Sequence, residues 1–405
     1  MPPWLRQTFA ALAVLHFRVL WVATLFAFTG FFMSTVVNGV MAFELTGSNT
    51  AVGLVVFSQG LAMTLLGPLG GAYADRLPKR RVVVVGSLTS GLVFAATGGL
   101  THTGAIAMWH LALGAGVLGS CFAFHGPARQ AIVPDIVPAD RRGNAMALSQ
   151  VANNASRVSG PALAGWLLAW PALGAAGAYF TMAGLYAMAA LSLSWLPRSR
   201  RRGDLDTRVL ADVVAGLRYV RARPQLRVLL LMFVAVIMTG FPYIAVLPGF
   251  VANQLERGPE TVGLLMGVAA LGGLATSVAV ARFADSPRAR GIYSGLGLAF
   301  GASLVALSRA PDYHAALWLS FAVGAANGGF QTLANACLLH ATEALFVGRV
   351  MSLSMLAFGG FGLMGLPIGA LADAFGERTA LAAMGVVVCS IVLGSWSALA
   401  RADAA

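Results

Sequence analysis

Charged residues are scarce in this sequence. Asp, Glu, Lys and Arg make up only 10% of the 405 residues, against roughly 25% in soluble domains, and 58% of the residues are hydrophobic. Because so few charges cannot cover a water-facing surface, an ordinary soluble domain is excluded. The 48 glycines and 17 prolines lie within long apolar stretches, where membrane helices tolerate both residues.

Several chemical signatures are also missing. The three cysteines, Cys121, Cys337 and Cys389, lie far apart and show neither metal-ligand spacing nor a disulfide framework. The sequence contains no His-Glu-x-x-His, Gly-x-Ser-x-Gly or Walker motif, which argues against hydrolysis and against ATP-driven pumping. We therefore expect that the protein is not an enzyme and uses no metal or cofactor.

Apolar runs divide the sequence into twelve predicted membrane helices. A helix that crosses about 30 Å of hydrocarbon needs roughly 20 apolar residues, whereas barrel strands would alternate over about ten. The first run is too long for the core of a cleaved signal peptide. The predicted spans are 19–43, 51–71, 82–101, 105–128, 144–168, 176–196, 227–252, 261–283, 292–309, 314–339, 350–372 and 379–400.

Lys and Arg predict how these spans are oriented. With both termini in the cytoplasm, the 27 basic residues lie on the cytoplasmic side except Arg257, Arg309 and Arg378, which lie outside, and Arg157, which lies within a span. This excess follows the positive-inside rule. We expect a multi-pass protein of the inner (plasma) membrane, in which the scattered basic residues form no nucleic-acid patch.

The longest polar stretch, residues 197–226, separates six spans from six. It opens with four arginines and continues with apolar residues at helical spacing, which predicts an amphipathic helix against lipid headgroups on the cytoplasmic face. These residues are Arg198, Arg200, Arg201 and Arg202, then Leu210, Val213, Val214, Leu217 and Val220. The predicted domains are an N-terminal six-helix bundle, 1–196, this linker, and a C-terminal six-helix bundle, 227–405.

The two halves contain an internal repeat. Residues 52–81 align without a gap with residues 262–291, so that Val52-Gly53-Leu54 matches Val262-Gly263-Leu264 and Ala74-Asp75 matches Ala284-Asp285. Repeated halves are typical of secondary transporters, which hold their substrate near the bilayer midplane. The repeat therefore favours a transporter over a passive channel or a receptor.

Between the second and third predicted spans the sequence reads Gly71-Ala-Tyr-Ala-Asp75-Arg76-Leu-Pro-Lys79-Arg80-Arg81, and a degenerate copy, Ala281-Arg-Phe-Ala-Asp285, stands at the matching place in the second half. This segment resembles the signature loop of the major facilitator superfamily. The resemblance extends over nearly the whole chain. It implies an all-α membrane protein with twelve transmembrane helices in two pseudo-symmetric six-helix bundles.

Six further segments are similar to one group within that superfamily, which contains the enterobactin exporter, macrolide efflux proteins and the transmembrane secretion effectors. This similarity implies export. The arginine that many proton-coupled drug antiporters carry in span 4 is absent from predicted span 105–128. The segments are Glu44-Leu-Thr-Gly-Ser48, Pro127-Ala-Arg129-Gln-Ala, Val133-Pro-Asp135-Ile-Val-Pro138, Gly160-Pro161-Ala-Leu-Ala-Gly165, Gly348-Arg349-Val-Met-Ser352 and Gly369-Ala-Leu-Ala-Asp373.

The resemblance also implies a gate at the cytoplasmic ends of the spans. Asp75 is expected to face the start of span 11, where unpaired backbone N–H groups favour an anion. By the repeat, Asp285 is expected to face the start of span 5 near Asn144. The alternative is that these are ordinary loop charges. The other gate candidates are Gly71, Arg76, Lys79, Arg80, Arg129 and Arg349, and Arg141 and Arg142 lie near Asn144 in the sequence.

Small residues predict where membrane helices approach closely. We expect span 5 to meet span 8, and span 2 to meet span 11. The candidates in the first pair are Gly160, Pro161 and Gly165 with Gly263, Gly267, Gly272 and Gly273. Those in the second pair are Gly60, Gly67, Gly70 and Gly71 with Gly359, Gly362 and Gly365.

Polar residues within the spans are candidates for contact with cargo. Arg157 is the one charged residue predicted well inside a span, where a charge is costly and is a functional candidate by default. Alternatively, it bonds nearby carbonyls or reaches toward the inner surface. His110 and His125, in span 4, are candidates for proton relay or for structural roles. The amide candidates are Asn153, Asn154, Asn38, Gln59, Asn327, Gln331 and Asn335.

These features predict a secondary active exporter of a drug, siderophore or other small amphiphile that works by alternating access. An ion gradient, expected to be of protons, would supply the energy, as in an antiporter. An importer of the same fold, and a passive channel or receptor, are the alternatives. The expected partners are a small-molecule substrate and the lipid bilayer, and the chain is expected to be a monomer. One buried arginine, with no buried carboxylate, favours anionic or neutral cargo over organic cations.

Overall fold

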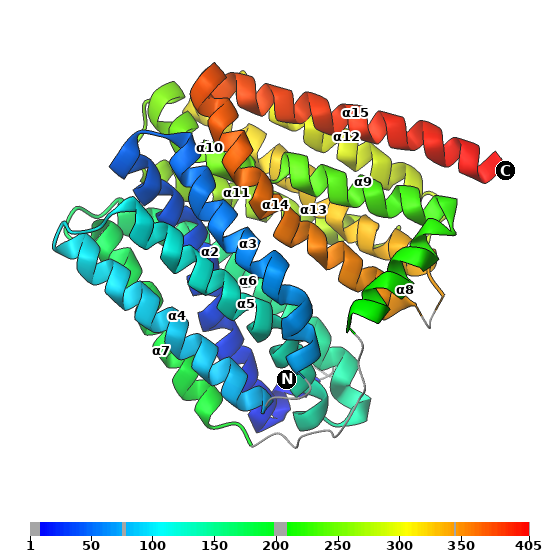
Figure 1. Ribbon diagram of the computed structural model, residues 1–405, viewed down its shortest axis with the longest axis horizontal. Helices are drawn as coiled ribbons and strands as arrows, with labels where there is room; N and C mark the ends of the chain where they lie inside the picture. The colour runs from blue at the N-terminus through cyan, green and yellow to red at the C-terminus, as the bar shows by residue number, and fades with distance from the viewer. Residues whose placement is uncertain (1–8, 75–77, 198–208, 344–345, 405) are drawn as a thin grey trace. The chain divides into compact units, whose positions relative to one another are not determined.

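The computed structural model describes residues 9–74, 78–197, 209–343 and 346–404, and these residues form helices joined by short connections, without a strand. Figure 1 shows the helices in chain order. The elements are η1 (Ala10–Ala13), α2 (Leu15–Thr46), α3 (Asn49–Ala74), α4 (Lys79–His102), α5 (Met108–Ile136), η2 (Ala139–Arg141), α6 (Arg142–Leu168), α7 (Gly174–Ser194), α8 (Val209–Arg221), α9 (Pro224–Gly240), α10 (Tyr243–Gly249), η3 (Phe250–Gln254), α11 (Glu260–Ala281), α12 (Ala289–Ser308), α13 (Tyr313–His340), α14 (Val347–Phe375) and α15 (Glu377–Ala404).

Ten helical stretches among the described residues are long and apolar enough to cross a membrane. One of them, Pro224–Gln254, joins α9, α10 and the π-helical turn η3. The predicted all-α membrane class is therefore confirmed. The two remaining long helices, α6 with 27 residues and α13 with 28, match predicted spans 5 and 10 in length but carry more polar residues.

The polar character of α6 is compatible with a helix that is half covered by protein. Its buried residues include Ala145, Leu148, Ala152, Ser156 and Gly160, which recur every three or four positions and so share one face. This face meets α2, where the Trp21 indole donates to the Leu148 carbonyl and the Ser156 hydroxyl donates to the Leu25 carbonyl. A helix held in this way exposes less of its surface to lipid, so it tolerates a lower apolar content.

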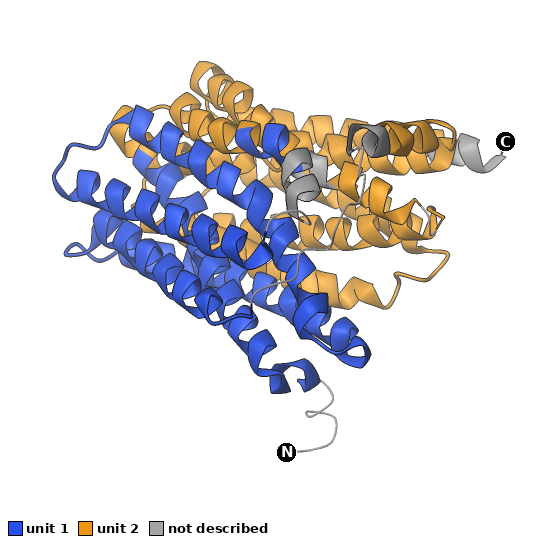
Figure 2. Ribbon diagram, turned by 60° about the horizontal axis from the view of Figure 1, so that its bottom comes forward, with its two compact units in different colours: residues 1–41, 62–207 blue, residues 42–61, 208–405 orange. Residues whose placement is uncertain are grey.

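The chain divides into two compact units, shown in Figure 2, and each has its own core. The first comprises residues 1–41 and 62–207, and within it α4 packs along α5 and α7. The second comprises residues 42–61 and 208–405, and within it α13 packs along both α11 and α12, while α15 packs along α12. The contacts group residues 42–61 with the second unit, whereas the predicted division places them in the N-terminal bundle. The division at the linker 197–226 remains a prediction.

Residues 42–61 belong to the second unit because α3 and α14 touch through their backbones. A Cβ atom added at Gly60 would lie 2.5 Å from the Cα of Gly362, and one added at Gly53 would lie 2.3 Å from the carbonyl oxygen of Gly365. Such distances leave no room for any side chain. Glycine at these positions is what lets the two helices pack at this separation.

The glycines predicted to join spans 5 and 8 also make close contacts inside their own units, and the contact between the two spans remains a prediction. Gly160 lies against α2, where an added Cβ would be 2.7 Å from the Cβ of Phe32. Gly272 lies against α13, where an added Cβ would be 2.2 Å from the carbonyl oxygen of Phe321. Small residues mark a close helix contact but do not identify the partner helix, so these contacts with α2 and α13 were not predicted. Pro161 and Gly165 are buried in α6.

The amphipathic helix predicted in 197–226 is α8, although the four arginines that precede it lie outside the described residues. Tyr219 stacks on Phe346 with ring centroids 4.0 Å apart, and its hydroxyl accepts a hydrogen bond from the backbone N–H of Glu343 at 2.9 Å. These contacts fix α8 beside the start of α14. Its contact with lipid headgroups remains a prediction.

The glycine contact generates a stability test. Gly60→Ala should lower the apparent melting temperature of the detergent-solubilised protein, because overpacking a tight contact costs about 1–3 kcal/mol. The matched control is Gly295→Ala in the middle of α12, where an added Cβ meets nothing within 4 Å. That change should leave the melting temperature equal or slightly raised, because alanine is the better helix former. Equal melting temperatures for the two variants would contradict the proposed contact.

Candidate gating clusters and polar residues of the spans

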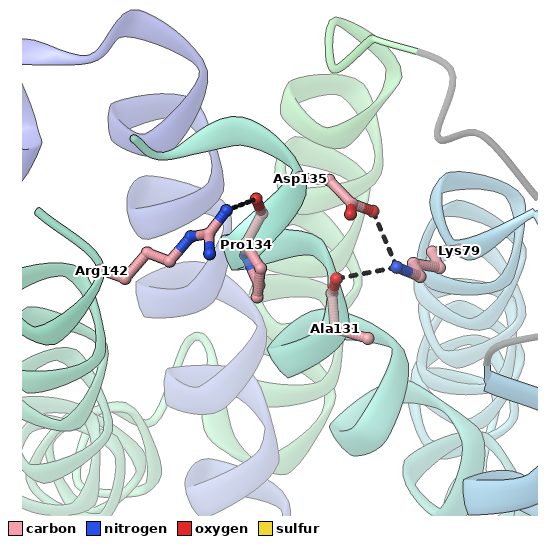
Figure 3. Close-up of polar contacts among 5 residues, drawn as sticks. All are labelled: Lys79, Ala131, Pro134, Asp135 and Arg142. Atoms are coloured by element: carbon pink, nitrogen blue, oxygen red, sulfur yellow. Dashed lines mark hydrogen bonds and ion pairs between the residues drawn. The ribbon is translucent and has the colours of Figure 1, made fainter. Parts of the chain in front are cut away.

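Lys79 and Asp135 form a partly buried ion pair at the start of α4 (Figure 3). Lys79 is only 5% exposed, and its Nζ donates to Asp135 Oδ2 at 2.7 Å and to the Ala131 carbonyl at 2.9 Å. The Lys79 ammonium therefore donates both to a backbone carbonyl near the end of α5 and to the Asp135 carboxylate. This contact ties α4 to α5 within the first unit.

Prolines explain why cations gather at this end of α5. The helix runs through Pro127 and Pro134, and Pro138 follows its last turn. Because proline has no N–H group, residue 138 cannot donate to the Pro134 carbonyl. Arg142 replaces that donor, with Nη2 at 3.0 Å from the Pro134 oxygen and Nε at 3.3 Å from the Val137 oxygen. Positive charge is also favoured at a helix carboxyl end by the helix dipole.

The residues of the signature loop are only partly covered by the structure. Gly71 belongs to the last turns of α3, whereas Asp75 and Arg76 lie outside the described residues. The Arg80 guanidinium donates to the Ser194 carbonyl at the end of α7. Lys79 and Arg80 therefore contact α5 and α7 of their own unit, and the position of Asp75 remains a prediction.

The residues predicted around a second gate have contacts within their own units. Asp285 Oδ1 lies 2.9 Å from His340 Nε2, with the Asp285 side chain 91% exposed. Asn144 Oδ1 accepts a hydrogen bond from the Ala11 backbone N–H at 2.9 Å. Arg349, which was predicted at the first gate beside Asp75, lies in α14, with its guanidinium 5.2 Å from the Phe346 ring and its Cβ near Gly216. The expected facing of Asp285 and α6 remains a prediction.

A second cluster surrounds Asp373, near the opposite end of α14. Oδ1 accepts from the Asn49 backbone N–H at 2.7 Å and from Asn49 Nδ2 at 3.1 Å. Oδ2 accepts from the Thr50 backbone N–H at 2.8 Å and from the Ser48 hydroxyl. An acid on α14 thus caps the amino end of α3, where free N–H groups and the helix dipole favour negative charge.

Glu377 extends this cluster to η3 and α15 of the same unit. It is 5% exposed and accepts from three side-chain amides, those of Asn49 at 3.1 Å, Asn253 at 2.7 Å and Gln254 at 3.1 Å. The neighbouring Arg378 donates to Gln254 Oε1 at 2.9 Å and to the Ser308 carbonyl at 2.9 Å. The start of α15 is thereby linked to α3, to η3 and to the end of α12.

Asp373 was not among the functional candidates predicted from the sequence, although one signal points to it. Gly71-x-x-x-Asp75 and Gly369-x-x-x-Asp373 share the same spacing of glycine and aspartate at the end of an apolar run. Ser48, Asn49 and Thr50 also carry the residue types that favour helix amino ends. Only the fold shows that the two segments, more than 320 residues apart, meet.

The helix of predicted span 4 extends past the predicted end of that span at residue 128. α5 continues to Ile136, and the span that it forms includes Arg129. The prolines at 127 and 134 suggested a loop, but proline is tolerated in membrane helices when other groups satisfy the freed carbonyls. Arg129 is therefore a buried arginine of a membrane helix, 9% exposed, and not a charge of a loop. Arg157 is not the only cation inside a span.

The cavity candidates lie on several helices, and some have structural partners. Arg157, half-buried in α6, has its guanidinium 5.5 Å from the Phe32 ring. Asn38 is buried and accepts from the Tyr179 hydroxyl at 2.8 Å, which links α2 to α7. In the second unit, Asn327 is buried and accepts from Gln331 at 3.1 Å. Asn153, Asn154 and Gln59 are half-buried and Asn335 is exposed. Contact of these residues with cargo remains a prediction.

Comparison with known proteins assigns the family. The family model described as "Transmembrane secretion effector" matches residues 6–405. The multidrug efflux pump Tap of Mycolicibacterium fortuitum is 27% identical over 84% of this chain and 84% of its own length. The staphyloferrin A transporter of Staphylococcus aureus is 24% identical over 88% of this chain and 89% of its own length.

Two further comparisons bear on coverage and on the fold. YfiS of Bacillus subtilis, an uncharacterized MFS-type transporter, is 25% identical over 60% of this chain, and the match spans 57% of that relative. The crystal structure of the nucleoside transporter NupG superposes with a TM-score of 0.72 over 95% of this chain and 98% of that one, at 11% identity. At this identity the likeness shows the fold alone. The chain is a member of the transmembrane secretion effector family of major facilitator transporters.

Proposed function

We propose that this transporter exports a small amphiphilic molecule, such as a drug or a siderophore, by alternating access. The observation that carries the proposal is the Asp373 cluster, in which one acidic side chain of α14 caps the amino end of α3. Alternating access requires contacts that hold one end of the helices together and can be broken without unfolding either helix. A side-chain cap at a helix end meets this requirement, because the backbone bonds of α3 persist without it.

A second cap of the same kind is proposed at the opposite ends of α3 and α14. α3 leads into the signature loop, where Asp75 is proposed to cap the start of α14 in the same way. Lys79 and Asp135 brace the neighbouring ends of α4 and α5. We propose that the inner and outer caps are used in turn, with the outer cap formed when the inner one is open.

The direction and the energy source are proposals that rest on weaker support. Export is favoured by a relative that is named as a multidrug efflux pump. Proposed cargo contacts are Arg157 and the amide residues of the spans, and a proton gradient is the proposed energy source. An importer would use the same fold, so direction has to be measured.

Reconstitution tests the function directly. The purified full-length chain in proteoliposomes, loaded with a panel of siderophores, antibiotics and lysolipids, should show saturable flux that requires an imposed proton gradient and stops when a protonophore is added. Flux toward the side of the termini would indicate an importer. Flux that neither saturates nor depends on a gradient would indicate a channel and contradict the proposal.

The outer cap gives a prediction with a matched control. Asp373→Asn should reduce the transport rate severalfold, because an amide offers one acceptor oxygen and no charge where four donors converge. The expected loss in cap stability is about 0.3–2 kcal/mol. The control is Asp312→Asn, because Asp312 Oδ1 accepts from Ala315 N–H and caps only its own helix, α13.

Asp312→Asn should lower the apparent melting temperature by a similar amount while transport proceeds at the wild-type rate. The measurement is initial flux per correctly folded protein, with melting temperatures recorded for both variants. If both variants lose the same fraction of transport, Asp373 contributes stability and not gating.

The inner brace gives a double-mutant test. Lys79→Met and Asp135→Asn should each lower the free energy of unfolding in mixed micelles, and the double variant should lose less than the sum of the two. A coupling energy of about 0.5–3 kcal/mol is expected for charges in direct contact. Lys79→Met should be the more damaging change, because it also removes the donor to the Ala131 carbonyl. Strict additivity would mean that the ion pair contributes nothing to the fold.

A further inference from the structure

Arg129 is a buried cation whose hydrogen-bonding capacity is largely unused. It lies seven residues before the end of α5, which at 1.5 Å per residue is about 10 Å along the helix. Nη2 lies 3.3 Å from His125 Nε2. Among the residues that the structure describes, neither Nε nor Nη1 of this side chain has a hydrogen-bond partner.

Arg129 lines a small cavity in the first unit. Its walls come from α2, α5 and α7, its volume of about 20 Å³ is enough for a water molecule, and none of the described residues that line it is acidic. The Arg129 guanidinium lies 5.0 Å from the centroid of the Phe28 ring, and Phe31 stacks on Phe122 at 4.6 Å. The lining residues are Ala27, Phe28, Phe31, Phe122, His125, Gly126, Arg129 and Tyr186.

The contacts seen do not compensate for burying this charge. A cation over an aromatic ring gains about 0.5–2 kcal/mol. The effective cost of removing an ion from water is several kcal/mol. His125 supplies one neutral acceptor at most. A buried arginine under these conditions is suited to an anionic ligand, because an opposite charge with acceptor oxygens offsets both the charge and the unpaired donors.

The geometry of the guanidinium selects the kind of anion. His125 Nε2 can engage only one of the two protons on Nη2. The other Nη2 proton forms a two-donor edge, with Nε on one side or with Nη1 on the other. Such an edge matches the two oxygens of a carboxylate. At about 20 Å³ the cavity has room for the carboxylate alone, so the apolar body has to lie beyond it, against the phenyl rings that surround this edge.

We infer that Arg129, oriented by His125, binds the carboxylate of an amphiphilic organic acid, whose apolar part lies against Phe28, Phe31 and Phe122. This inference rests on the proposed export function and names the chemical class of the cargo as a carboxylic acid. The inference also explains the presence of a buried arginine whose charge is not compensated by the described residues around it.

A binding measurement tests the inference without requiring transport. The purified full-length chain in detergent is titrated with 4-phenylbutyrate and, in parallel, with 4-phenylbutyramide, which has the same apolar body without the charge. The carboxylate should raise the apparent melting temperature in a saturable way, and the amide should not. A shift by both compounds, or by neither, would overturn the inference.

Variants separate binding from folding. Arg129→Met should fold with a melting temperature equal to or above that of the wild type, because replacing an uncompensated buried charge by an apolar residue of similar size is neutral or stabilising. It should also need at least tenfold more 4-phenylbutyrate for a half-maximal shift, whereas Arg129→Lys should be intermediate. The control Arg309→Gln removes an exposed charge and should respond as the wild type does.

The outcomes distinguish this inference from the proposed function. If Arg129→Met melts far below the wild type without ligand, or keeps the full response to the carboxylate, then Arg129 is not the binding residue and the inference fails. If the wild type binds 4-phenylbutyrate through Arg129 while proteoliposomes show no gradient-dependent flux of any compound, the site stands and the proposed export fails.

Discussion

The close approach of two backbones, at Gly53 with Gly365 and at Gly60 with Gly362, is the constraint on which much of the second unit depends. Because two glycine pairs are in contact, α3 and α14 are fixed in rotation as well as in separation. That register brings the start of α3 beside the end of α14, where Asp373 can reach three consecutive residues. Larger side chains at the contact would separate α3 from α14, and the hydrogen bonds between Asp373 and the start of α3 would then be lost.

Much of the architecture could be predicted from the sequence, because the length of an apolar run and its flanking charges are local properties. The span positions and the resemblance to major facilitator proteins follow from such signals. The end of α5 was missed because Pro127 and Pro134 are helix breakers in water, whereas a membrane helix tolerates both. The contacts of Gly160 with α2 and of Asp373 with α3 were also missed, because the local sequence pattern does not identify the partner in a tertiary contact.

The polar groups of this protein differ in how well their surroundings compensate them. Lys79 has both a carboxylate and a carbonyl, and Glu377 accepts from three amides, so these side chains stabilise the ends of helices. Arg129 is as deeply buried but has one weak neutral partner and an aromatic face. This contrast distinguishes Lys79 and Glu377, which stabilise helix ends, from Arg129, whose burial costs stability and whose donors are available for the proposed ligand.

The length of α3 has a mechanical consequence. The helix has 26 residues, so at 1.5 Å per residue it extends about 39 Å from the Asp373 cluster to the signature loop. A rigid rod of this kind acts as a lever, because tilting one end displaces the other. The stiffness of this rod is lowest near Pro68, since the Thr64 carbonyl receives no N–H from that position and a helix bends most cheaply where a backbone hydrogen bond is missing.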